Sequence, residues 1–95
     1  MIQYSNPLPA GMAVCVEGHH PQLVESRGAP SSVRGLGAGA AQWHVECFQC
    51  GIATVPTTHP SLALMHWRSP PDLFHIPLIQ LPRVRERMAA AVAAA

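Results

Sequence analysis

The strongest constraint on the fold comes from residues 43–51, with the sequence WHVECFQCG, which hold a Cys-x-x-Cys-Gly motif. The one other cysteine, Cys15, is followed four residues later by His19. Two ligand pairs on two tight turns are typical of a structural zinc site, in which both turns close on one tetrahedral ion. We therefore predict that Cys15, His19, Cys47 and Cys50 bind Zn²⁺.

The choice of histidine stays open at this level, because His20 and His44 also lie beside the two motifs. Three cysteines are an odd number, which argues against a complete disulfide framework and favours a metal site in a reducing compartment. The 95 residues include ten prolines and seven glycines, so little regular structure is left to form a core. A bound metal would compensate for a small core.

The charge and hydropathy patterns exclude several classes of protein. All six basic residues are arginines, five residues are acidic, and the net charge is +1, so composition gives little support for non-specific nucleic-acid binding. No apolar run approaches the roughly 20 residues of a membrane span. The N-terminus lacks the basic start and apolar core of a signal peptide. We expect a cytoplasmic protein.

The pattern along the chain predicts four regions and a small α+β fold. It has a zinc-ribbon-like antiparallel sheet, one packed helix and a C-terminal helix. The regions are an irregular N-terminal arm at 1–11, a zinc-ribbon-like domain at 12–68, a Pro-rich extended segment at 69–82 and a helix at 83–95.

Within the ribbon, strands are expected at 12–16, 21–25, 42–46 and 52–55. Residues 26–41 are rich in Gly, Ala and Ser and predict a flexible hairpin connection. Gly51 suits a turn that requires a positive φ. A helix is expected at about 60–68, capped by Thr58 and stopped by the prolines at 70–71. Its side chains expected to cover the sheet are Leu62, Met65 and Trp67.

The C-terminal part differs in character. Residues 73–81 are apolar but include Pro77, which predicts an extended or edge segment and not a central strand. The helix at 83–95 follows from propensity. Its apolar stripe comprises Val84, Met88, Ala91, Val92 and Ala95. The arginines at 83, 85 and 87 lie in its first turns, where cations oppose the helix dipole. A solvated face is the favoured interpretation, and a contact surface is the alternative.

We expect no enzymatic activity. A zinc deaminase also uses His-x-Glu and Cys-x-x-Cys, but there the two motifs open separate helices that converge on the metal. Here His44, Glu46, Cys47 and Cys50 share one short segment. A redox role for the two cysteines would require a helix N-terminus to lower the thiol pKa, whereas residues 51–55 predict a strand.

Three kinds of function remain open. The first is protein binding, through the apolar run at 73–81 and the arginines of the last helix; this surface includes Phe74, Ile76, Ile79, Arg83 and Arg87. The same run could instead pack on the ribbon or form a homodimer. The second is nucleic-acid binding through phosphate pairing and base stacking, for which the natural contacts are Arg27, Arg34 and Trp43. The third is a structural or assembly role with zinc only for stability.

Two family resemblances accompany these predictions. Residues 43–50, WHVECFQC, resemble the central segment of a LIM domain, which reads Trp-His-x-x-Cys-Phe-x-Cys. A LIM domain has eight ligands around two zinc ions. The chain lacks both a first Cys-x-x-Cys at a suitable distance and the later cysteine pair. The resemblance is local and covers eight residues.

Residues 14–68 resemble the small phage and prophage zinc-ribbon proteins of the Lar type, named for restriction alleviation. The matching features are a first turn followed by a strand at 15–25, the segment at 44–51, Pro56 and Trp67. The second cysteine of the first turn is replaced by Gly18 or a histidine. The resemblance implies a zinc-binding accessory protein in the host cytoplasm, which blunts a host defence, of restriction or CRISPR type, by binding a protein or nucleic acid.

Overall fold

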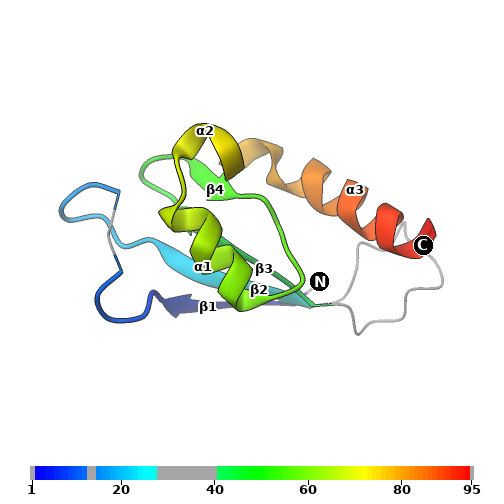
Figure 1. Ribbon diagram of the computed structural model, residues 1–95, viewed down its shortest axis with the longest axis horizontal. Helices are drawn as coiled ribbons and strands as arrows, with labels where there is room; N and C mark the ends of the chain where they lie inside the picture. The colour runs from blue at the N-terminus through cyan, green and yellow to red at the C-terminus, as the bar shows by residue number, and fades with distance from the viewer. Residues whose placement is uncertain (1, 13–14, 28–40, 95) are drawn as a thin grey trace.

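A five-stranded antiparallel sheet forms the centre of the molecule in the computed structural model, which describes residues 2–12, 15–27 and 41–94 (Figure 1). The strands, in the spatial order β1-β2-β3-β4-β5, are β1 Ile2–Pro7, β2 Gln22–Arg27, β3 Gln42–Cys47, β4 Ile52–Thr54 and β5 His75–Pro77. The helices are α1 Pro60–Arg68, α2 Pro71–Phe74, the 3₁₀ turn η2 Leu78–Gln80, and α3 Leu81–Ala94. The predicted small α+β class with an antiparallel sheet is confirmed.

Strand β3 is the central strand, and its alternation separates two different faces of the sheet. On the first face the side chains of Val45 and Cys47 are fully buried and pack with Ala63 and Trp67 of α1. Partly buried apolar side chains complete this core: Leu8, Met12, Leu23, Trp43, Cys50 and Leu64. Burial of apolar area on this face favours folding.

The second face is polar although it is buried. Gln42 and His44 of β3 lie opposite Ser26 and Val24 of β2, and all four are buried. The buried Arg85 of α3 approaches His44 from this side. The sheet is therefore covered by α1 on one face and by α3 on the other.

Helix α1 confirms the predicted range, and of the three side chains expected to cover the sheet only Trp67 is buried. Ala63 and Trp67 are its buried residues, whereas Leu62 is 36% exposed and Met65 is 45% exposed. The Trp67 ring stacks on the His75 ring of β5, with centroids 5.4 Å apart. His59 occupies the N-cap position of α1, and its side chain makes no capping hydrogen bond. The prediction that Thr58 caps the helix is therefore wrong.

The prediction of an irregular arm at residues 1–11 is also wrong. Residues Ile2–Pro7 form β1, which pairs with β2 from Ile2 opposite Arg27 to Pro7 opposite Gln22. All six residues of β1 are exposed. Pairing with a neighbouring strand, and not burial, therefore determines this conformation.

The remaining predictions concern the ranges of the strands. The strands expected at 21–25, 42–46 and 52–55 are present as β2, β3 and β4. The strand expected at 12–16 is not formed at Met12, Cys15 or Val16, because the chain bends there toward the first turn; residues 13–14 and most of the connection at 26–41 lie outside the described residues. Of the segment at 69–82 that was predicted to be extended, only His75–Pro77 is, as the edge strand β5. Pro71–Phe74 forms α2 and Leu78–Gln80 forms η2, so the prediction is wrong there.

Helix α3 begins at Leu81, two residues earlier than predicted, with Pro82 in its first turn, where a missing N–H costs nothing. Leu81 and Arg85 are buried, and Val84 and Met88 are half-buried. The interpretation of the arginines as a solvated face is therefore right for positions 83 and 87 and wrong for Arg85. Among the described helices, none is long and apolar enough to cross a membrane.

Candidate metal centre

The first turn of the site presents Cys15 and His19. Gly18 has φ +89°, a conformation that favours glycine, and the N–H of His19 donates to the carbonyl of Val16 at 3.0 Å. This tight turn brings the imidazole back toward the cysteine, and Cys15 Sγ lies 3.5 Å from His19 Nδ1.

The second turn connects β3 to β4 and presents Cys47 and Cys50. Cys47 is the last residue of β3 and is fully buried. The N–H of Gly51 donates to the carbonyls of Cys47 at 3.0 Å and Phe48 at 3.2 Å. Gly51 has φ +67°, which confirms the predicted positive φ. Both turns lie at the end of the sheet opposite the end of α3 (Figure 1).

The four predicted ligands converge. Their ligand atoms all lie within 4.8 Å of one another. His19 Nδ1 lies 3.5 Å from the sulfur of Cys47 and 3.4 Å from that of Cys50, and the sulfurs of Cys15 and Cys47 are 3.2 Å apart. The three cysteines are free thiols. A disulfide would place its two sulfurs about 2.05 Å apart, so the geometry is that of a ligand set and not of a bridge.

These separations fit a tetrahedral ion. With metal–sulfur distances of about 2.3 Å and a metal–nitrogen distance of about 2.0 Å, sulfur and nitrogen ligands are about 3.5 Å apart, and two sulfurs are about 3.8 Å apart. The sulfur–nitrogen distances already match. To bind one ion, the Cys15 and Cys47 sulfurs would have to move apart by roughly 0.5 Å from their present distance. A thiolate-rich set with one imidazole suits a borderline-soft divalent cation.

The thiols of the centre differ in acidity. Burial of the Cys15 sulfur among the other ligands, with hydrogen bonds to the Cys47 and Cys50 thiols, raises the pKa of Cys15 to about 12. Burial acts in the same direction on Cys47, but hydrogen bonds from the backbone N–H of Cys50 and from neighbouring thiols outweigh it and lower the pKa of Cys47. The Cys47 thiol is therefore a stronger acid than the Cys15 thiol.

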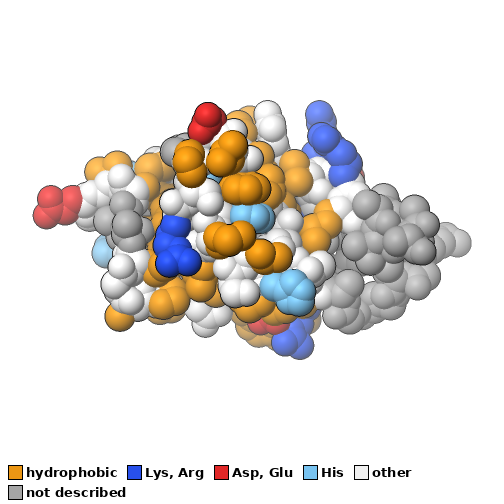
Figure 2. Space-filling view, in the orientation of Figure 1, with side chains coloured by type: hydrophobic (Ala, Val, Ile, Leu, Met, Phe, Trp, Pro, Cys, Tyr) orange, Lys and Arg blue, Asp and Glu red, His pale blue; other side chains and the backbone are white. Residues whose placement is uncertain are grey.

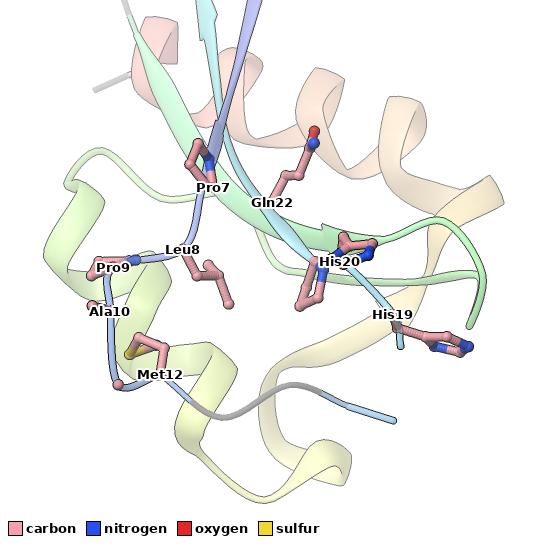
Figure 3. Close-up of a pocket in the computed structure, with 10 residues that line it drawn as sticks. Pro7, Leu8, Pro9, Ala10, Met12, His19, His20 and Gln22 are labelled. Carbon is pink, nitrogen blue, oxygen red and sulfur yellow. The ribbon is translucent and has the colours of Figure 1, made fainter. Parts of the chain in front are cut away.

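The structure decides between the three candidate histidines. His19 belongs to the cluster, and His20 and His44 do not. Figure 3 shows the His19 ring pointing away from Leu8 and Met12, which line an apolar hollow of about 300 Å³ beside the centre. His44 lies on the opposite face of β3, where its Nε2 is 2.7 Å from the Glu46 carboxylate.

The residues predicted to contact partners are distributed unevenly. Ile79 is 89% exposed and Arg83 and Arg87 are exposed, whereas Phe74 and Ile76 are half-buried. Phe74 stacks on His66 with ring centroids 4.1 Å apart. Figure 2 shows hydrophobic side chains gathered over α1 and α2, and the exposed ones there include Leu62, Met65 and Leu73.

Two of the residues proposed for nucleic-acid contact are already engaged within the protein. Arg27 pairs with Glu25 at 2.7 Å, and Trp43 is half-buried against the core. Arg34 lies outside the described residues.

Sequence reasoning missed a polar cluster beneath α3. Arg85 NH2 lies 3.5 Å from His44 Nδ1, and the Gln3 amide, oriented to satisfy its hydrogen bonds, accepts from both terminal nitrogens of Arg85 at 2.9 and 2.7 Å. The sequence of β3 could have indicated this polar cluster, because Gln42, His44 and Glu46 alternate there with apolar residues. We nevertheless predicted a solvated Arg85.

Comparisons of the chain with protein-family models, with curated proteins and with solved structures give no match. The site is therefore described by its own geometry: three cysteines and one histidine from two turns, placed so that they could hold one metal ion.

Proposed function

We propose that the chain is a zinc-binding protein in which Cys15, His19, Cys47 and Cys50 hold one Zn²⁺ as a structural centre. The observation that carries the proposal is the convergence of four ligand atoms from two distant turns within 4.8 Å. Zinc prefers thiolate and neutral imidazole ligands in tetrahedral geometry, and three cysteines with one histidine form one of its usual structural sets.

The same ligand set supports a non-catalytic role. A catalytic zinc ion keeps one coordination position open for water or substrate, whereas four protein ligands close the site. The centre joins the segment before β2 to the β3–β4 turn. Structural zinc contributes roughly 10 kcal/mol or more of folding free energy, which exceeds what the small α1 core supplies.

Neighbouring histidines provide a matched test. His19→Ala should lower zinc affinity by at least about 100-fold and lower the unfolding temperature, because one ligand is lost. His20→Ala removes an exposed imidazole one residue away and should change neither. Zinc affinity is measured by competition with a chromogenic chelator, and unfolding by circular dichroism. Equal affinity in both variants would contradict the assignment.

We further propose that the zinc-stabilised domain binds a partner protein. The side chains of Leu73 (63%) and Ile79 (89%) are exposed, and so are those of Arg83 and Arg87 on α3. Leu73→Asp with Ile79→Asp should leave a folded, zinc-loaded protein that no longer retains partners in affinity purification. Unchanged retention would remove this surface from the proposal, and a dimer that dissociates in the variant would make the partner a second copy.

The resemblance of residues 14–68 to Lar-type proteins supports a narrower proposal, that the partner belongs to a host defence. Expression of the chain in a restricting bacterial host should raise the plating efficiency of unmodified phage. The His19→Ala variant should lose this effect. An unchanged plating efficiency would contradict the host-defence role and leave the zinc site unaffected.

A further inference from the structure

A small polar pocket lies beside the metal centre and belongs to none of the features used above. It has a volume of about 250 Å³ and is lined by His20, Gln22, Glu46, Phe48 and Gln49. Two of these residues, Phe48 and Gln49, lie between the ligands of the second turn, and His20 follows the ligand of the first turn. Ligand pockets for whole small molecules have volumes of about 300–1,000 Å³. This pocket is therefore of a size for the end of one side chain.

Glu46 is the charged group of the pocket, and the fold orients it. His44, which is fully buried, lies with its Nε2 2.7 Å from Glu46 Oε1, and its Nδ1 is 3.5 Å from Arg85 NH2. A guanidinium only donates hydrogen bonds, so Nδ1 must accept and Nε2 must carry the proton that is donated to Glu46. This chain of contacts fixes the tautomer of His44 and the direction of the carboxylate.

The Glu46 carboxylate can also accept further hydrogen bonds from a ligand. The Glu46 side chain is 26% exposed, and among the described residues its hydrogen bond with His44 is the only one that it makes. Arg85, whose charge also acts on Glu46, does not line the pocket.

Phe48 provides the second recognition element. Its side chain is 81% exposed, at a position where an ordinary turn would carry a polar residue, and it borders the same pocket as the carboxylate. Aromatic faces attract cations, and guanidinium groups stack on them more often than ammonium groups do. The side-chain oxygens of Gln22 and Gln49 add hydrogen-bond acceptors for N–H groups.

We propose that this pocket binds one arginine side chain of a partner protein. The guanidinium pairs with the free oxygen of Glu46 and stacks on Phe48. Guanidinium–carboxylate pairs combine charge with planar geometry, and an anion is disfavoured by the ionised carboxylate. The proposal concerns a different surface from the apolar one at Leu73 and Ile79.

The test uses the zinc-loaded full-length protein and N-acetyl-arginine amide as the probe, followed by NMR titration. The probe should shift the resonances of Phe48, Gln49 and Gln22 saturably, with a Kd in the millimolar range. N-acetyl-citrulline amide has the same shape without the charge and should bind at least about tenfold more weakly. Equal responses to the two probes, or no saturable shift, would overturn the proposal.

Variants separate recognition from folding. Glu46→Gln should abolish the response to the arginine probe, whereas Glu25→Gln, which changes a carboxylate on β2 that is paired with Arg27, should not. Since Glu46 precedes a ligand, zinc content is measured in the same samples. Phe48→Leu keeps an apolar side chain at an exposed position and should weaken binding about two- to fivefold, as expected for loss of a surface cation–π contact. Unchanged affinity in Phe48→Leu and Glu46→Gln would contradict the assigned pocket.

Discussion

The two faces of the sheet are stabilised in different ways, although both are built from alternating residues of β3. The face under α1 buries Val45 and Cys47 with Trp67 and continues into the metal centre. The face under α3 buries His44 and Arg85, which depend on each other and on Gln3 for hydrogen bonds. One face buries apolar area and carries the four residues that could bind a metal ion, and the other avoids the cost of unpaired polar groups.

This difference predicts how each face responds to substitution. On the face under α1, loss of a metal-ligating residue or of apolar volume directly lowers the free energy of unfolding. Loss of one member of a buried polar cluster leaves the others without partners, and replacing both members by apolar groups costs less than replacing one. The predictions below test this contrast, beginning with the largest expected effect.

Cys47→Ser should have the largest effect, because Cys47 belongs both to the metal centre and to the core. Structural zinc supplies roughly 10 kcal/mol or more, comparable with the whole stability of about 5–15 kcal/mol for a typical domain. The variant should be largely unfolded by circular dichroism and by NMR dispersion. Gln49→Ala, an exposed change within the same turn, should fold normally. A folded Cys47→Ser protein without metal would refute the structural role of the centre.

Trp67→Ala tests the apolar part of the same face. Truncation of a buried tryptophan costs about 3–5 kcal/mol, and the stacking partner His75 also loses its contact. The free energy of unfolding, measured in urea with zinc present, should fall by that amount. Met65→Ala on the exposed side of α1 should cost less than about 1 kcal/mol. Similar losses in the two variants would indicate that the helix packs through the predicted stripe after all.

Arg85→Met tests the polar face. The substitution keeps much of the side-chain volume but leaves His44 and Gln3 without a donor, so we expect a loss of about 1–3 kcal/mol. The double variant His44→Leu with Arg85→Met should lose less than the sum of the two single changes in a double-mutant cycle. Arg87→Met, at an exposed position of the same helix, serves as the control. Additive losses would show that the two residues do not act together.

The pH dependence of zinc affinity should show the smallest effect. The raised pKa of Cys15, about 12, means that this thiol keeps its proton at neutral pH in the metal-free protein. Zinc binds the thiolate, so binding releases that proton, and affinity should rise with pH by at least about tenfold per unit below the pKa. The lowered pKa of Cys47 makes its contribution smaller. Competition titrations at several pH values measure the slope, and a flat profile would contradict proton release.

The sequence was sufficient to predict the metal centre because the ligand chemistry is local. Cys47 and Cys50 are fixed by their spacing, and the second pair has few alternatives in a chain with three cysteines. The choice of His19 over His20 and His44 required coordinates, since the turn geometry decides which ring faces the thiols.

The parts that could not be predicted depend on tertiary contacts. Strand β1 is exposed along its length and forms through pairing with β2. Its own sequence carries no burial pattern, and the prolines in this region suggested an irregular arm. The burial of Arg85 depends on acceptors supplied by β1 and β3. In each case the deciding partner lies far away in the sequence.

Native mass spectrometry of protein purified without chelator tests the central claim most directly. The account predicts one zinc ion per chain under native conditions and loss of the ion after acid denaturation. A folded protein that carries no metal, with its three cysteines as free thiols, would contradict the assignment of Cys15, His19, Cys47 and Cys50 as a structural zinc site.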